Sequence, residues 1–355
     1  MKLVKVDSGK QRCAYLNFKS RLYAGDGGYV CTAKFNAAAL LYKKTDFARS
    51  CFIEPVIVLG DDGGICAAGT YIHNPELPYL QLGLFEAEES AEEAVKLIIE
   101  GAKETARKRG LEKILAGMNG HLSYGVGILE EGFDNKISFD SVYNKSYYKD
   151  YFKPYISGKE TLSVYRADMD AVLKRIKPFR ARGGLAVREA DLKNFARETE
   201  ILRGLCNRTL DKTFLYTHAG EGHFTQLMGG LKAILRPGNL LFAVKDGVPA
   251  GFLFWHPDFN SGLRGGHEYN LLRIYFKAKQ AHKKSDAFKI NAIGSVGDNP
   301  YVTAALIAAA VERCTENFKY AETTFVWDNN ARSAVLNRNL FGEPYRRYKV
   351  YFIDV

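Results

Sequence analysis

Amide side chains and small residues near the end of the chain have the types and spacing needed to bind a ligand with amide and anionic groups. Asn330 follows an aromatic strand pattern at 321–327 and opens a helical pattern, so its side chain can cap that helix or hydrogen-bond a ligand amide. Asn337 lies seven residues further on, where its amide can hydrogen-bond but cannot act as an acid. The glycines of residues 294–297 would let the backbone approach an anion closely, although a solvated basic loop is the simpler interpretation.

The first half of the chain carries a second set of polar residues suited to binding or proton transfer. Asn144 and Tyr151 keep the same seven-residue spacing, and a tyrosine hydroxyl can protonate a leaving group. The alternative for Tyr151 is aromatic core packing. Asn119, Ser123 and Tyr124 lie in a polar loop after a strand pattern, where binding residues often occur, and an ordinary connector would look the same.

Composition argues against several other kinds of chemistry. The six cysteines include no Cys-x-x-Cys pair and the seven histidines lack ligand spacing, so neither a metal site nor a disulfide framework is expected. Residues 1–10 have no apolar core, and the longest apolar run, at 304–311, is far too short to span a membrane. We therefore expect a cytoplasmic protein with no membrane partner. The net charge of +10 favours an anionic partner, or serves only solubility.

The elements that must position these residues occur twice in the same order. A hairpin pattern at 55–72 turns at a Gly-rich segment, and a second hairpin at 239–255 turns at Asp246 and Gly247. Each is followed by a strand, a capped helix, a strand, a helix and a strand, with a period of about 184 residues. This order predicts an α/β protein with a mixed sheet flanked by helices in each half.

Two helix starts in this pattern can be predicted from local chemistry. Ser90 and Glu93 have the spacing of a capping box that would open a helix in the first half. In the second half, Pro300 suits the first position of a helix whose apolar stripe includes Leu306. The basic, glycine-containing segment between the halves is expected to be the domain junction.

Several motifs resemble those of the GNAT acyl-CoA N-acyltransferase superfamily. Asn330, Ser333, Leu336 and Gly342, followed by an aromatic strand, are similar to the C-terminal signature of that superfamily. The segment at 242–252 and the first-half pieces at 83–86, 117–119 and 143–148 resemble a group of uncharacterised bacterial proteins with two tandem GNAT-like repeats. The resemblance implies a first GNAT-like domain at 1–170, a linker at 171–184 and a second GNAT-like domain at 185–355.

The resemblance also implies an activity, the transfer of an acyl group from acetyl-CoA or another acyl-CoA to a small-molecule amine. In that superfamily the pantetheine lies between two diverging strands, and the pyrophosphate binds amides at the start of the next helix. The usual Arg-x-x-Gly-x-Gly loop is altered in both halves of this chain. Asp298 and Tyr301 take the first two positions in the second half, and Glu89 and Glu92 take them in the first. We therefore expect the first half not to bind CoA.

The expected site follows from the same resemblance. The residues expected to bind the cofactor are Ile293, Gly294, Ser295, Gly297, Asn299, Tyr301, Val302, Asn330 and Asn337. The residues expected to bind the acceptor are Asn119, Ser123, Tyr124, Asn144, Trp255 and Asp258. No catalytic residue is assigned, and Tyr151 is the candidate.

Two other functions fit the same sequence. A tandem-GNAT transferase that takes aminoacyl-tRNA would suit the positive charge and would need no pyrophosphate loop. A non-catalytic protein that binds a ligand between its domains would tolerate the altered loops. The acceptor, the acyl chain and the oligomeric state do not follow from the sequence.

Overall fold

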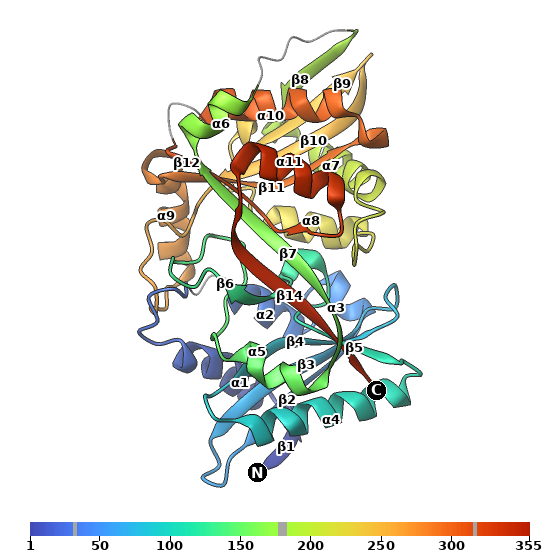
Figure 1. Cartoon of the computed structure of the whole chain (residues 1–355), viewed down its shortest axis with the longest axis vertical. Coiled ribbons are helices and arrows are strands. Elements are labelled where there is room, and N and C mark those ends of the chain that lie inside the picture. Colours follow the sequence, from blue (N-terminus) through green and yellow to red (C-terminus); the bar gives the residue numbers. More distant parts are fainter. Residues whose placement is uncertain (31–33, 177–182, 315–317) are drawn as a thin grey trace. The chain divides into compact units, whose positions relative to one another are not determined.

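The computed structural model describes residues 1–30, 34–176, 183–314 and 318–355, and these form two compact units (Figure 1). Unit 1 contains Met1–Leu162, Arg264–Tyr269 and Arg346–Val355. Unit 2 contains Ser163–Leu263 and Asn270–Tyr345. Each unit has a mixed sheet with helices packed on it, which confirms the predicted fold class.

Unit 1 is built on a sheet with the strand order β1-β2-β3-β4-β5-β14, followed by the first half of β7, with β6 paired to β14. The pairs β1–β2, β2–β3, β3–β4, β5–β14 and β6–β14 are antiparallel, and β4 and β5 run parallel. The strands are β1 (Lys2–Lys5), β2 (Phe52–Leu59), β3 (Ile65–His73), β4 (Leu80–Ala87), β5 (Lys113–Ala116), β6 (Ile128–Glu131), β7 (Ile156–Asp168) and β14 (Pro344–Asp354). The helices are α1 (Gly9–Leu22), α2 (Lys34–Leu41), α3 (Asp46–Ser50), α4 (Glu92–Lys108) and α5 (Tyr148–Phe152), with 3₁₀ turns η1 (Leu122–Tyr124) and η2 (Lys153–Tyr155).

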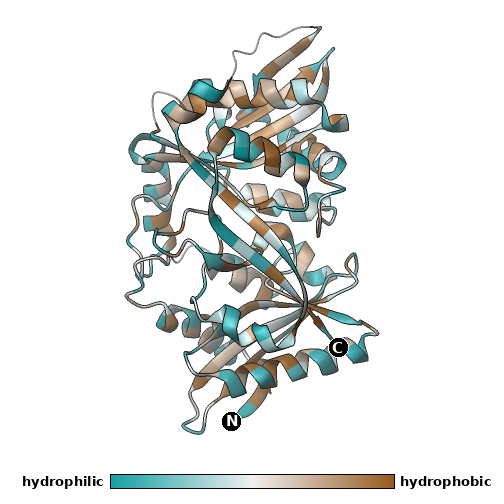
Figure 2. Cartoon of the chain, in the orientation of Figure 1, coloured by the Kyte–Doolittle hydropathy of each residue, from teal (hydrophilic) through white to brown (hydrophobic). Residues whose placement is uncertain are grey.

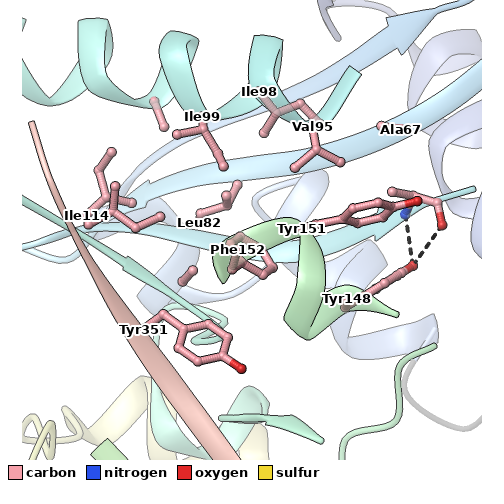
Figure 3. Close-up of a cluster of buried hydrophobic side chains, with 14 of the residues drawn as sticks. Ala67, Leu82, Val95, Ile98, Ile99, Ile114, Tyr148, Tyr151, Phe152 and Tyr351 are labelled. Atoms are coloured by element: carbon pink, nitrogen blue, oxygen red, sulfur yellow. Dashed lines mark hydrogen bonds between the residues drawn. The ribbon is translucent and has the colours of Figure 1, made fainter. Parts of the chain in front are cut away.

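Helix α4 supplies the main apolar layer of unit 1. Val95, Ile98 and Ile99 recur at helical spacing, and they are buried in one cluster with strand residues such as Leu82 and Ile114. Figure 3 shows these α4 side chains directed toward the sheet, with residues of α5 in the same cluster. The outward residues of α4 are charged, so Figure 2 shows both hydrophilic and hydrophobic segments along this helix.

The predicted capping box at the start of α4 is wrong. The N-cap residue is Ala91, no side chain of a capping box bonds there, and Ser90 adopts a left-handed conformation with φ of 64°. The Ala91 N–H instead donates to the hydroxyl of Tyr151, at 3.1 Å. The hydroxyl of a residue far along the chain therefore holds the N–H of the N-cap residue, and no side chain of the described residues caps the first turn of α4.

Unit 2 has the strand order β12-β11-β10-β9-β8, with the second half of β7 beside β12 and β13 paired to β7. The strands are β8 (Leu185–Glu189), β9 (Leu240–Lys245), β10 (Val248–Pro257), β11 (Ala287–Ser295), β12 (Tyr320–Thr323) and β13 (Val326–Trp327). The helices are α6 (Met169–Arg175), α7 (Phe195–Thr209), α8 (Glu221–Gly229), α9 (Leu271–Lys284), α10 (Pro300–Cys314) and α11 (Ala331–Phe341). The 3₁₀ turns are η3 (Leu192–Asn194), η4 (Pro237–Asn239) and η5 (Val296–Asp298).

The two faces of the unit 2 sheet bury different helices. Leu306 of α10 packs in one cluster with Leu253 and Phe288. Leu202 of α7 packs in another with Phe252, which is next to Leu253 in the strand and therefore on the opposite face. Helix α10 begins at Pro300, as predicted. The predicted strand at 321–327 is interrupted, because β12 ends at Thr323 and β13 begins at Val326.

Two strands join a sheet that chain order would not assign to them. The C-terminal strand β14 pairs with β5 in unit 1, with Tyr351 opposite Ala116. The second half of β7 pairs with β12 in unit 2, with Arg166 opposite Glu322. The predicted linker at 171–184 contains part of α6 and residues 177–182, which lie outside the described residues. The predicted domain boundaries therefore stay a prediction.

Candidate functional site

Strands β11 and β12 of unit 2 pair only over their first part. The parallel register runs from Ala287 opposite Tyr320 to Ile290 opposite Thr323, and the Thr324 N–H donates to the Ile290 carbonyl at 2.8 Å. Beyond this point, within the described residues, positions 292–295 stay paired with β10 and have no partner in β12. The predicted cofactor residues Ile293, Gly294 and Ser295 all lie on this diverging part of β11.

The segment after β11 turns sharply into α10. Gly297 and Asp298 have positive φ angles of 66° and 51°, and a Cβ built on Gly297 would meet open space. Asn299 precedes α10, and its Oδ1 accepts from the N–H groups of Tyr301 and Val302 at 3.0 and 3.4 Å. The amides predicted to hold a phosphate are therefore capped by Asn299, which an anion would have to displace.

Helix α11 holds the two predicted amide side chains in local bonds. Asn330 is the N-cap, and its Oδ1 accepts from the Ser333 N–H at 3.1 Å. Asn337 donates to the Ser333 carbonyl at 2.8 Å. The capping alternative for Asn330 is thus the one that the structure contains, and binding of a ligand amide stays a prediction.

Arg332, a residue that the sequence did not single out, places a cation at the start of α10. Its guanidinium donates to the Asp298 carbonyl and lies 3.9 Å from the Asp298 carboxylate. The position where the superfamily loop would carry arginine holds Asp298 in this chain, and the Arg332 guanidinium of α11 pairs with it. The sequence of the loop alone could not have predicted this contact, because Arg332 and Asp298 are 34 residues apart.

A row of polar residues crosses four neighbouring strands of unit 2 just before β11 and β12 diverge. His256 of β10 is opposite Lys289 of β11, Lys289 is opposite Glu322 of β12, and Glu322 is opposite Arg166 of β7. We call these four residues the polar ladder. Register partners point to the same face of a sheet, so the ladder residues are side-chain neighbours. Their strand neighbours Trp255, Phe288, Ala321 and Tyr165 belong to the α10 cluster, which places the ladder on the other face.

The ladder is deeply buried around its carboxylate. Lys289 and Glu322 are 1% and 2% exposed. Glu322 Oε2 accepts from the Tyr345 hydroxyl at 2.8 Å and lies 3.9 Å from the Arg166 guanidinium. Burial lowers the pKa of His256 to about 3, so this imidazole is neutral at physiological pH. Buried charges are costly and mark structural networks or functional sites. A lysine and a glutamate within strands that are largely buried were the sequence signal for this ladder.

The corresponding part of unit 1 has its backbone groups occupied by side chains of the same unit. Strands β4 and β5 pair from Leu80 to Leu82 only. The Leu84 N–H then donates to Asn119 Oδ1 at 2.8 Å, and the Ala87 N–H donates to the Tyr148 hydroxyl at 2.8 Å. Tyr147 donates to the Ala87 carbonyl at 2.9 Å. A ligand running along β4 would have to displace these three side chains.

Tyr148 also belongs to a buried polar cluster around Glu86. Tyr23 and Tyr148 each donate to Glu86 Oε2 at 2.8 Å, and Lys19 forms an ion pair with Oε1. Burial raises the pKa of both tyrosines well above the usual value, so they stay protonated as donors. Tyr151 accepts from Ala91 and donates to the Glu88 carbonyl at 2.5 Å. These bonds give Tyr151 a structural role at the start of α4, and Figure 3 shows its ring beside that of Tyr148.

The residues predicted to bind the acceptor are divided between the two units. Asn119 also donates to the Tyr124 carbonyl, at 3.1 Å, so these two share one loop. The Ser123 N–H in that loop donates to the imidazole of His121 at 3.1 Å. Asn144 lies apart from them, bonded through both its amide atoms to the backbone of Leu129.

The other two acceptor candidates lie in unit 2. Trp255 is buried in the α10 cluster and donates to the Gly238 carbonyl at 2.7 Å. Asp258 Oδ1 accepts from the Asn260 N–H at 3.0 Å. Acceptor binding by all six residues stays a prediction. Among the described residues, no group of histidine, cysteine, aspartate and glutamate could hold a metal ion.

Solved structures with the tandem GNAT fold resemble this chain along nearly its whole length. No family model and no curated protein matches it. A tandem GNAT protein from the clavulanic acid biosynthesis pathway, solved without AcCoA, aligns with a TM-score of 0.58 and 11% identity, over 99% of this chain and 98% of that one. A GCN5-related glucosamine N-acetyltransferase region in a fungal multi-domain GH3 β-N-acetylglucosaminidase aligns with a TM-score of 0.58 and 11% identity. The alignment covers 99% of this chain and 38% of that one.

A conserved protein of unknown function from Enterococcus faecalis V583 aligns with a TM-score of 0.51 and 7% identity, over 99% of this chain and 71% of that one. At these identities the likeness concerns the fold. The chain therefore has the fold of the GNAT superfamily, with the tandem character that its internal repeat predicts.

Proposed function

We propose that this protein is an N-acyltransferase that moves an acyl group from acyl-CoA to an amine, with the cofactor in unit 2. The observation that carries the proposal is the divergence of β11 and β12 after Ile290 and Thr323. The diverging strand leads directly to the turn at Gly297 and the start of α10, where Arg332 supplies a positive charge. In the GNAT fold this is the place for pantetheine and pyrophosphate.

The difference between the units supports unit 2 over unit 1. In unit 1, Asn119 and Tyr148 bond the β4 amides that a pantetheine arm would need. The helix that follows begins with Glu92 and Glu93, whose charges repel phosphate. In unit 2, α10 begins with no acidic residue in its first turn, and Arg332 lies beside Asp298.

The groups at the start of α10 fit a cofactor that carries phosphates. The open space at Gly297 allows close approach of a phosphate oxygen, and the Arg332 guanidinium can neutralise its charge. Asn330 can turn its amide from Ser333 to the ligand, at the expense of one helix cap. When bound, acyl-CoA supplies a thioester carbonyl that an amine can attack.

Glu322 is the residue best placed to accept the proton that the amine loses during attack. Its carboxylate lies next to the point of divergence, and the Tyr345 hydroxyl and the Arg166 guanidinium orient it. A carboxylate held in a fixed orientation can accept a proton from the ammonium group that forms when the amine attacks the thioester. We assign no such role to Tyr151, whose hydroxyl is engaged at α4.

Calorimetric titration of acetyl-CoA into the full-length protein tests the proposal. Arg332→Ala should weaken binding by roughly tenfold, the loss of one charge-assisted contact of about 1.4 kcal/mol. Arg338→Ala is the matched control, because Arg338 is on the same helix, is similarly exposed and pairs with Glu343. Equal affinity in the two variants would contradict the placement. Absence of any acyl-CoA binding, with RNA in the purified protein, would favour the aminoacyl-tRNA alternative.

A further inference from the structure

Unit 2 carries an added helix that unit 1 lacks. The connection between β3 and β4 in unit 1 spans residues 74–79, whereas the equivalent connection between β10 and β11 spans residues 258–286 and contains α9. The helix has its own start signal, because Asn270 Oδ1 accepts from the Arg273 N–H at 2.9 Å. A long connection with its own structure is commonly a binding element.

One face of α9 fixes it to unit 2. Ala278, Ala281 and His282 are buried at helical spacing. His282 also bonds the Ile234 carbonyl through Nε2, at 3.0 Å. The opposite face is therefore held outward in a defined orientation.

The first part of α9 carries large apolar side chains that are exposed. Leu271, Leu272 and Phe276 are 60%, 70% and 59% exposed, and Leu272 and Phe276 are one helical turn apart. Exposed apolar residues scattered singly need no explanation, but Leu272 and Phe276 are neighbours on one side of the helix, and Leu271 lies in the same first turns. We call these three residues the apolar end of α9.

The charges on α9 are all positive. Its basic residues are Arg273, Lys277, Lys279, Lys283 and Lys284, and the helix has no acidic residue. Lys279 lies over the ring of Tyr275 at 4.7 Å from the centroid, next to the apolar end. Lys277, Lys279, Lys283 and Lys284 form no ion pair within the described ranges. The helix thus presents apolar groups and uncompensated cations together.

We propose that α9 binds the surface of an anionic lipid bilayer. The apolar end would enter the interfacial region, and the lysines would contact phosphate headgroups, the two contributions that together give stable attachment. A bilayer accepts protruding side chains without a matching pocket, which suits a convex helix better than a protein partner does. The contact is at the surface only, since no helix of the described residues is long and apolar enough to cross a membrane.

This proposal differs from the sequence prediction of no membrane partner. That prediction considered membrane spans, and the exposure of the apolar end depends on which face of α9 is buried. Binding of α9 to a bilayer does not depend on the proposed acyl transfer, so one proposal can fail while the other holds.

Co-sedimentation of the full-length protein with vesicles tests the proposal. Vesicles of phosphatidylcholine with phosphatidylglycerol should bind wild type roughly tenfold more strongly than vesicles of phosphatidylcholine alone. The double variant L272E/F276E should lose this binding, because it removes two apolar contacts and adds negative charge. K279E/K283E should lose it as well, with the apolar end intact.

Val248→Glu is the matched control, because Val248 is 62% exposed and lies on the β9–β10 hairpin, away from α9 in sequence. It should bind vesicles as wild type does. If wild type does not co-sediment with anionic vesicles, the proposal is wrong. An acidic protein would then be the partner to test. Unchanged binding by L272E/F276E, with an unchanged circular dichroism spectrum, would also overturn it.

Discussion

Tyr151 can be tested as a structural residue by a single change, Tyr151→Phe. The change removes one oxygen and keeps the ring, which packs with Tyr147 and Tyr148. It deletes the bond to the Ala91 N–H at 3.1 Å and the bond to the Glu88 carbonyl at 2.5 Å. Ala91 is only 4% exposed, so its N–H would be left without a partner in a buried position.

Leaving a buried donor unsatisfied costs about 1–3 kcal/mol. Because Tyr151→Phe leaves the Ala91 N–H in this state, we expect it to lower the free energy of unfolding by about 2 kcal/mol. Urea denaturation followed by circular dichroism measures this change. Affinity for acetyl-CoA should stay that of wild type.

The matched control is Tyr155→Phe. Tyr155 follows α5, packs against the same apolar cluster, and forms no side-chain hydrogen bond in the described part of the chain. Tyr155→Phe should therefore leave the free energy of unfolding nearly unchanged. The reasoning is refuted if Tyr151→Phe is as stable as wild type but lowers the rate of acyl transfer, since that result would restore the catalytic role.

Three further predictions concern unit 2. Asn330→Ala should lose about 1 kcal/mol of stability with the cap to Ser333 and, if the amide also holds the ligand, about tenfold in acetyl-CoA affinity by calorimetry. Glu322→Gln should keep that affinity and lower kcat roughly 100-fold, and an unchanged kcat would exclude Glu322 as the base. Burial lowers the pKa values of His256 and His282 to about 3 and about 4. The unfolded chain then binds more protons below pH 6.5, so stability should fall as the pH drops from about 6.5 toward 4. His256→Asn should flatten this fall in urea midpoint, and an unaltered slope would contradict the burial argument.

Much of the fold could be predicted because its signals are local. Hairpin turns at glycine, the apolar stripe of α4 and Pro300 at the start of α10 each depend on a few neighbouring residues. The start of α4 was mispredicted for the same reason. Ser90 and Glu93 have the right spacing, but Ser90 adopts φ of 64°, and the Ala91 N–H at the helix start is bonded by Tyr151, 60 residues away.

The pairing of β7 and β14 and the polar ladder depend on contacts that no local pattern encodes. β14 reads as the last strand of the second repeat, yet it pairs with β5 of unit 1. The ladder needs the register of four strands before Lys289 and Glu322 become neighbours. Arg332 needs the approach of α11 to the turn at Asp298. The sequence of the loop could therefore show that the usual arginine is missing, but not that Arg332 approaches Asp298.

The placement of the cofactor in unit 2 can be tested most directly by hydrogen–deuterium exchange of the full-length protein with and without acetyl-CoA. We predict that acetyl-CoA slows exchange at residues 293–303, the diverging end of β11 and the start of α10, and leaves residues 84–94 of unit 1 unchanged. Protection at 84–94 without protection at 293–303 would contradict the account.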